Sequence, residues 1–249
     1  MSGAAVARIG TQLSAQSYAV PQGAKICGFQ EALSAQPGTD KPVASACGKA
    51  VMADHVWRRA MLGLAAYSSK LESLAHGADR ETAGKLEAAM SGVNDANWIQ
   101  VEGAQEQAAR DAIAQLFTQL KTNTSKGDLA QTVKESAPQV KVLCDGLSAY
   151  LDTQVKAISD IQADVEKKKA ARGDRRCGTV DNKSVCVGES FLDRMVYGNL
   201  FGDLTSIENS HLDARDNVAT FCAAHRKLED AAANNRLSNS KTYQEIIDA

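Results

Sequence analysis

An uninterrupted spacing of apolar residues in the last fifth of the sequence restricts the possible folds of this chain more than any other feature. From residue 204 to residue 232 the positions alternate steps of three and four, which is the heptad pattern of a helix packed against another helix. The positions are Leu204, Ile207, His211, Ala214, Val218, Phe221, His225, Leu228 and Ala232. At the helical rise this seam is about 43 Å long. The pattern predicts one long, half-buried helix.

Similar stripes recur along most of the chain, and the composition agrees with them. The sequence has 41 alanines, only 4 prolines and 5% aromatic residues, which favours helix. Stripes predict helices over residues 24–35, 43–75, 79–90, 98–121, 138–170 and 190–235. Pro138 is expected in the first turn of its helix, where its missing N–H is tolerated. The last helix is expected to be interrupted near Gly198 and Gly202.

The predicted fold is all-α: an elongated antiparallel bundle of about five to six helices. We expect an N-terminal arm with a short helix over residues 1–42. The bundle takes residues 43–249, with an insert at 175–189 between the last two long helices, and the whole forms one domain.

The insert reads as a small β-hairpin closed by a disulfide. In the stretch CGTVDNKSVC, Asp181 and Asn182 suit the centre of a tight turn. The pairs outward are then Val180 with Lys183, Thr179 with Ser184, Gly178 with Val185, and Cys177 with Cys186. Cysteines facing each other across such a hairpin lie within disulfide range. The alternatives are a chance spacing or half of a metal site.

Two further cysteine pairs are consistent with helical hairpins. Cys27 and Cys47 flank the turn-forming residues around Pro37, and Cys144 and Cys222 lie at similar distances before and after the β-hairpin. Three nested disulfides would indicate an oxidising compartment, so we expect a periplasmic or secreted protein. The first residues lack the apolar core of a signal peptide, and we expect a signal or lipid anchor to lie outside this sequence. No apolar run is long enough to span a bilayer.

The motifs that could carry chemistry are incomplete. Glu208 and His211 form half of a di-iron motif without a second copy. Cys222 and His225 could share a helix face, but no second ligand pair accompanies them. The seam histidines, His211 and His225, are about 21 Å apart and cannot bind one ion together. We therefore predict no catalytic residues, no metal, no cofactor and no enzymatic activity.

A cluster of cations before the hairpin is the strongest electrostatic feature. Residues 167–176 contain Lys167, Lys168, Lys169, Arg172, Arg175 and Arg176. Positive charge is favoured at the C-terminal end of a helix, so a solvated last turn explains it. The functional interpretation is contact with an acidic protein surface or anionic headgroups. The predicted partner-binding residues are Lys168, Lys169, Arg172, Arg175, Arg176, Asp181, Asn182 and Lys183.

These observations favour a non-enzymatic protein that acts through protein–protein contacts. A scaffold, adaptor, inhibitor or immunity protein of the bacterial envelope or secreted space fits best. The alternative is a carrier that holds an apolar ligand or cofactor between helices, lined by His211, His225, Trp57 or Trp98. A net charge of -2 and a pI near 6.1 disfavour nucleic-acid binding.

Overall fold

The computed structural model describes residues 12–13, 16, 23, 25–27, 47–76, 103–122, 129–173, 177–180, 183–186 and 191–237. Only the backbone is described at residues 48, 51–52, 76, 121–122, 168–169, 171–173 and 191–201, and in both strands. The predicted helix at 79–90 and most of that at 24–35 lie outside these residues.

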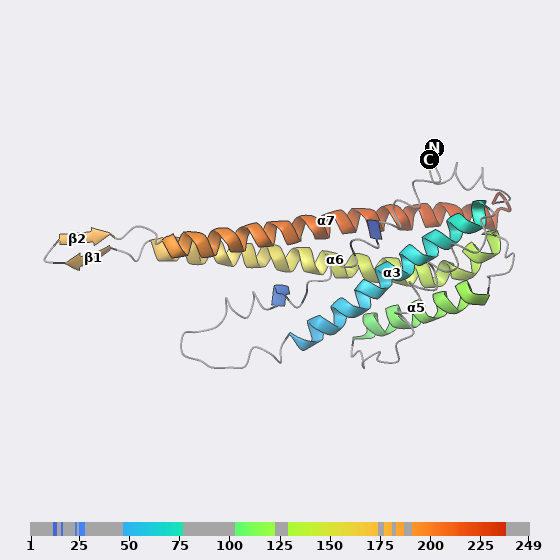
Figure 1. Ribbon diagram of the computed structural model, residues 1–249, viewed down its shortest axis with the longest axis horizontal. Coiled ribbons are helices and arrows are strands. Elements are labelled where there is room, and N and C mark those ends of the chain that lie inside the picture. The colour runs from blue at the N-terminus through green and yellow to red at the C-terminus, as the bar shows by residue number, and fades with distance from the viewer. Residues whose placement is uncertain are drawn as a thin grey trace.

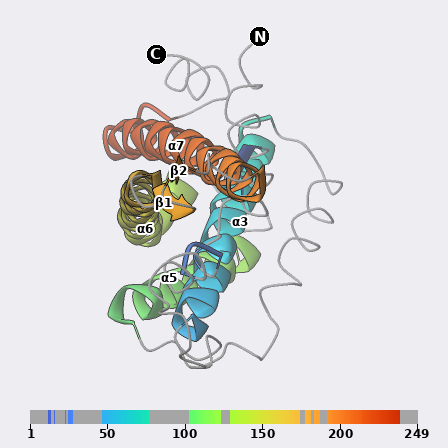
Figure 2. The same ribbon diagram turned by 90° about the vertical axis from the view of Figure 1, so that its left-hand side faces the viewer.

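Apart from two short strands, the described part is helical, which confirms the predicted all-α class. Its long helices are α3 (Gly48–His76), α5 (Ala104–Thr122), α6 (Leu129–Gly173) and α7 (Phe191–Ala233). Helices α6 and α7 run antiparallel, side by side, and continue past α3 and α5 (Figure 1). Seen along the long axis, α7 and α5 lie on opposite sides, with α3 and α6 between them (Figure 2).

We call the two parts of this arrangement the head and the shaft. The head consists of α3, α5, residues 129–150 of α6 and residues 216–237 at the end of the described chain. The shaft consists of residues 151–173 of α6 and 191–215 of α7. By helical rise, α6 extends about 34 Å beyond the head.

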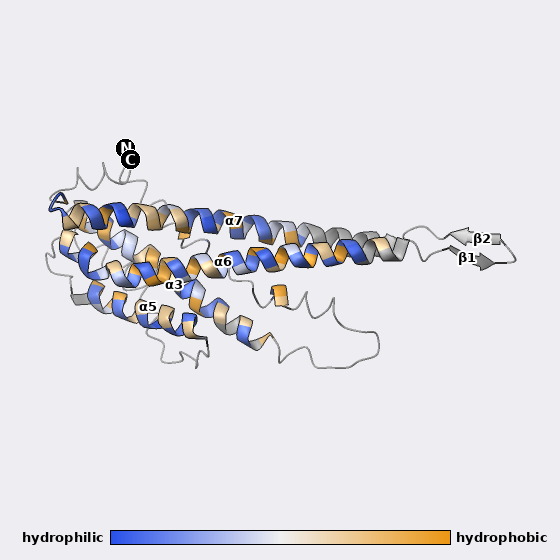
Figure 3. Cartoon of the chain, turned by 180° about the vertical axis from the view of Figure 1, so that it is seen from behind, coloured by the Kyte–Doolittle hydropathy of each residue, from blue (hydrophilic) through white to orange (hydrophobic). Residues whose placement is uncertain are grey.

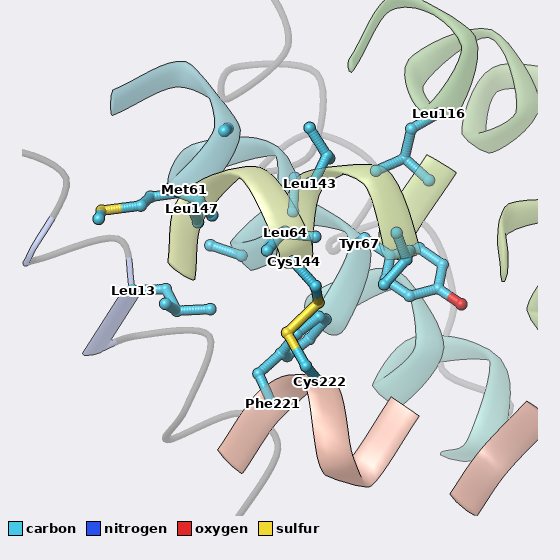
Figure 4. Close-up of a cluster of buried hydrophobic side chains, with 14 of the residues drawn as sticks. Leu13, Met61, Leu64, Tyr67, Leu116, Leu143, Cys144, Leu147, Phe221 and Cys222 are labelled. Carbon is cyan, nitrogen blue, oxygen red and sulfur yellow. A yellow bond between two sulfur atoms is a disulfide. The ribbon is translucent and has the colours of Figure 1, made fainter. Parts of the chain in front are cut away.

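The apolar stripes of the sequence form the core of the head. Hydrophobic residues (orange) and hydrophilic residues (blue) alternate along the described helices, as expected for amphipathic helices (Figure 3). The α3 stripe is fully buried at Trp57, Leu64 and Tyr67, and it packs with the stripes of α5, α6 and α7. The disulfide Cys144–Cys222 lies among these side chains and joins α6 to α7 (Figure 4).

Both disulfides predicted between helical segments are present. Cys144 and Cys222 have Cα atoms 6.0 Å apart, and Cys27 and Cys47 have Cα atoms 5.7 Å apart. Cys144 and Cys222 are 5% exposed, so their bond is enclosed by the core. The first bond fixes the register of α6 and α7, and the second ties the N-terminal segment to the start of α3.

Two details of the long helices differ from the prediction. Helix α6 begins at Leu129, so Pro138 lies in its interior and not in its first turn. A proline there removes the bond to the carbonyl of Lys134. The neighbouring carbonyl of Glu135 accepts a bond from Gln119 of α5, 3.0 Å long, so packing against α5 helps the helix to continue. Helix α7 passes through Gly198 and Gly202 without a break.

Two short strands follow the shaft. Strands β1 (Cys177–Val180) and β2 (Lys183–Cys186) pair antiparallel, with Cys177 opposite Cys186 and Val180 opposite Lys183. This is the backbone register derived from a turn at Asp181 and Asn182. The side chains of both strands lie outside the described part of the structure, so their closure by a disulfide stays a prediction.

Candidate functional site

The predicted partner-binding residues belong to the end of the molecule that is remote from the head. We call residues 167–186 the tip. Lys168, Lys169 and Arg172 occupy the last turns of α6, and Lys183 begins β2. Their side chains, and the whole of Arg175, Arg176, Asp181 and Asn182, lie outside the described part. Figure 1 places β1 and β2 beyond the joined ends of α6 and α7.

The shaft that carries the tip has a narrow apolar core. Its buried residues are Ile26, Ile158, Ile161, Val165, Leu204 and Ile207. Where the shaft meets the head, Arg215 Nη1 lies 3.6 Å from Asp152 Oδ1. Both side chains are largely solvated, so the pair adds little stability. Halfway along, Gln162 donates to Glu208 at 3.1 Å. These cross-contacts hold α6 and α7 in one register.

The outer surface of the shaft is acidic, in contrast to the sequence of the tip. Short of the tip, its described acidic side chains are Asp152, Asp160, Asp164, Glu166, Asp203, Glu208 and Asp213. The described cations in the same part of the shaft are Lys156 and Arg215. The negative charge of the described shaft side chains therefore contrasts with the six cations in the sequence of residues 167–176.

A short N-terminal piece, the strap (Gly23 and residues 25–27), crosses the junction of shaft and head. The Gly23 N–H donates to Asp54 Oδ1 of α3 at 2.9 Å. Ile26 is 2% exposed and completes the shaft core, while Lys25 lies 3.9 Å from Asp203 of α7. Cys27 bonds to Cys47. The strap thus connects α3, α6 and α7.

A buried polar cluster lies inside the head. Tyr67 Oη is 3.0 Å from His225 Nε2 and 2.7 Å from Ser136 Oγ, which is also 2.7 Å from the carbonyl oxygen of Thr132. These groups come from α3, α7 and α6, so the cluster joins three helices. Burial lowers the pKa of His225 to about 4, and the imidazole is neutral at pH 7.

A second polar cluster lies under the strap. Tyr150 donates to Asp54 Oδ1 at 2.7 Å, and its ring stacks on Trp57 with centroids 5.6 Å apart. Burial and the charge of Asp54 raise the pKa of Tyr150. His211 is fully buried, and its Nδ1 donates to the carbonyl of Ile207 at 2.7 Å. Burial lowers the pKa of His211, partly offset by the Ile207 bond and by Asp54.

The residues proposed to line a carrier cavity are distributed between these clusters. His225 belongs to the Tyr67 cluster, while Trp57 and His211 belong to the cluster under the strap. Trp98 lies outside the described residues. Cys222 is bonded to Cys144, and in the described ranges no three His, Cys, Asp or Glu side chains are grouped as metal ligands would be.

Sequence reasoning missed Asp54, Tyr150 and Ser136 as members of buried clusters. The side chain that each of them contacts comes from another helix, so the spacing along one helix does not reveal the contact. The sequence feature that came closest to predicting a buried polar cluster was Tyr67, whose hydroxyl lies within the apolar stripe of α3.

The comparisons add neither a family nor a relative. No protein-family model, curated protein or solved structure matches the chain. Across the helices that the structure describes, none combines the length and hydropathy needed to cross a membrane.

Proposed function

We propose that this protein is a non-enzymatic binding protein that contacts another protein through its tip. The proposal rests on the position of β1 and β2. They lie at the end of the two-helix shaft that is farthest from the head (Figure 1). A direct connection between two antiparallel helices needs only a few residues. Seventeen residues separate Gly173 from Phe191, and eight of them form paired strands. A connection of this length is more than the two helices need, and it suits the presentation of a hairpin to a binding partner.

The charge pattern supports an acidic partner surface. The tip sequence begins with six cations in residues 167–176, whereas the shaft surface is acidic. This contrast would guide an acidic partner to the end of the molecule and away from its sides. Anionic headgroups share the same chemistry.

We further propose that a disulfide between Cys177 and Cys186 closes the hairpin. The backbone register puts these two residues opposite each other. A closed hairpin keeps its turn in one conformation and lowers the ordering cost of binding. The two disulfides of the described part favour an oxidising compartment, and we propose the bacterial envelope or secreted space. An inhibitor or immunity protein and an envelope scaffold are concrete forms of this function.

The test compares two variants with the same change in net charge. The tip variant replaces Lys168, Lys169, Arg172 and Arg175 by Gln. The control variant replaces Lys134, Lys141, Arg226 and Lys227, which are exposed on the head, by Gln. A photo-reactive amino acid at position 183 captures the partner, and binding of the purified partner is then measured for all forms.

The proposal expects the tip variant, and a variant lacking residues 178–185, to lose at least tenfold in affinity. The head variant should bind like the wild type. Equal affinity of all four forms would contradict the proposal. Binding of the wild type to phosphatidylserine vesicles, with no captured protein, would replace the protein partner by a membrane surface.

A further inference from the structure

The cluster under the strap contains two buried acceptor atoms, one on α6 and one on α7. His211 Nε2 and Gln154 Oε1 are both inaccessible to solvent and have no hydrogen-bonding partner among the described residues. The Asp152–Arg215 and Gln162–Glu208 contacts bracket them along the two helices. Gln154 and His211 therefore belong to the same stretch of the helix pair.

The strap and α3 close this stretch from the side. Gly23 donates to Asp54 Oδ1, and a Cβ added to Gly23 would lie 3.4 Å from Gln154 Nε2, so the strap passes beside both side chains. The charge of Asp54 also acts on His211. The site is thus bounded by α3, α6, α7 and the strap.

The protonation of His211 decides what the site can accept. Its Nδ1 lies against a backbone carbonyl, which can only accept, so Nδ1 carries the proton of the neutral ring. Nε2 then presents a lone pair, directed away from the Ile207 carbonyl of its own helix. The amide oxygen of Gln154 also presents lone pairs. Two acceptors cannot bond to each other, and burying both without a donor destabilises the fold.

We propose that a water molecule is bound between α6 and α7 beneath the strap, where it donates one hydrogen bond to His211 Nε2 and the other to Gln154 Oε1. Water supplies two donors, the number that these two acceptors require. A metal ion fits less well, because the described residues offer no group of three His, Cys, Asp or Glu ligands. This water goes beyond the proposed function of the tip, since it lies where the shaft leaves the head.

The direct test is a crystal structure of the full chain, grown near neutral pH without added metal, at a resolution that shows ordered water. The expected result is one peak within hydrogen-bonding distance of both His211 Nε2 and Gln154 Oε1. A Gln154 amide that turns to donate directly to His211 would overturn the proposal. An anomalous peak from a metal ion at this position would do the same.

NMR of the histidines gives a second readout, with His225 as the internal control. We expect His211 to be the Nδ1–H tautomer and its ring protons to show a nuclear Overhauser effect to a long-lived water. His225 should show none, because the Tyr67 hydroxyl occupies its Nε2. Absence of the water signal at His211, or the Nε2–H tautomer there, contradicts the proposal.

A double-mutant cycle tests whether the two side chains act through a shared partner. His211→Leu and Gln154→Leu should each lower the urea midpoint, and the double variant should lose less than the sum, because the first substitution already removes half of the bridge. Gln119→Leu is the control, since Gln119 contacts α6 near its N-terminal end, at Glu135, away from Gln154. It should be additive with His211→Leu. Additivity of both pairs would count against the bridge.

Discussion

Gly146 allows the backbone of α6 to approach the indole of Trp57. A Cβ at this position would lie 2.5 Å from Trp57 Cη2 and 2.8 Å from Cζ3. Trp57 is 1% exposed and stacks on Tyr150, so its ring has no space into which to move. The pairing of a glycine on one helix with a tryptophan on another therefore sets the distance between α3 and α6.

Gly146→Ala should destabilise the protein by about 1 to 3 kcal/mol, which is the usual cost of overpacking. Urea unfolding measures it. Gly202→Ala is the matched control, because Gly202 is exposed on α7 and nothing lies within 4 Å of its added Cβ. That variant should gain about 0.5 to 1 kcal/mol from helix propensity. Equal effects of the two substitutions would show that the contact with Trp57 does not matter.

His225 should make the stability of the head depend on pH. Its pKa is about 4 in the folded protein and near 6.5 when unfolded, so protonation favours unfolding. The stability is complete above pH 6.5 and declines by about 3 kcal/mol as the pH falls to 4. The low pKa of His211 acts in the same direction. Unfolding free energies measured across this window test the prediction.

His225→Gln isolates the contribution of this histidine. The amide stays neutral and can still bond to Tyr67, so the acid-induced loss between pH 6.5 and 4 should shrink. An unchanged slope would place the pH dependence in other groups. NMR titration of the His225 ring should report a midpoint near 4 in the native protein.

At the scale of elements, Pro138 is an exposed residue inside α6 that leaves the helix continuous but removes one of its backbone hydrogen bonds. Pro138→Ala restores the N–H that the Lys134 carbonyl lacks and should stabilise the protein by about 1 to 3 kcal/mol. Ser159→Ala, also exposed on α6, is the control and should change stability by less than about 0.5 kcal/mol. Thermal unfolding distinguishes them. A less stable P138A variant would mean that the proline fits the contact with α5.

The two described disulfides should differ in their contribution to stability. Cys144 and Cys222 are 78 residues apart, whereas Cys27 and Cys47 are 20 apart. Loop-closure entropy predicts a loss of about 4.5 kcal/mol for the Cys144→Ala, Cys222→Ala variant and about 3 kcal/mol for the Cys27→Ala, Cys47→Ala variant. Urea unfolding of both double variants measures the order. If the variant without Cys27 and Cys47 lost more unfolding free energy, the strap would stabilise the fold by more than the loop-closure entropy of its disulfide.

Elements with a repeated pattern were predictable from the sequence, and single contacts were not. The stripes of α3, α6 and α7 and the alignment of Cys144 with Cys222 follow from spacing alone. Spacing alone does not predict that Pro138 lies inside α6, because a contact with Gln119 of α5 helps the helix to continue through this residue. The cluster under the strap was also missed, since Gly23, Asp54 and Tyr150 are brought together only by tertiary packing.

For the whole molecule, the Cys144–Cys222 bond encloses the shaft and the tip in one covalent loop. Trypsin should cut in the cation-rich residues 167–176, which lie inside this loop. The two products should remain one species on a denaturing gel without reductant and separate after reduction. In the Cys144→Ala, Cys222→Ala variant they should separate at once. Separation of the wild-type products without reductant would contradict the loop.

The same bond determines how the protein responds to mechanical force. A pull applied to the two ends of the chain reaches Cys144 from one side and Cys222 from the other, and the sulfur bridge transmits it directly. The 78-residue separation hides about 270 Å of contour length from the load. The shaft and tip therefore stay folded while the head is stretched. Force on the chain ends reaches the shaft helices only through packing contacts such as that of Ile26, whereas force applied at the tip loads them directly.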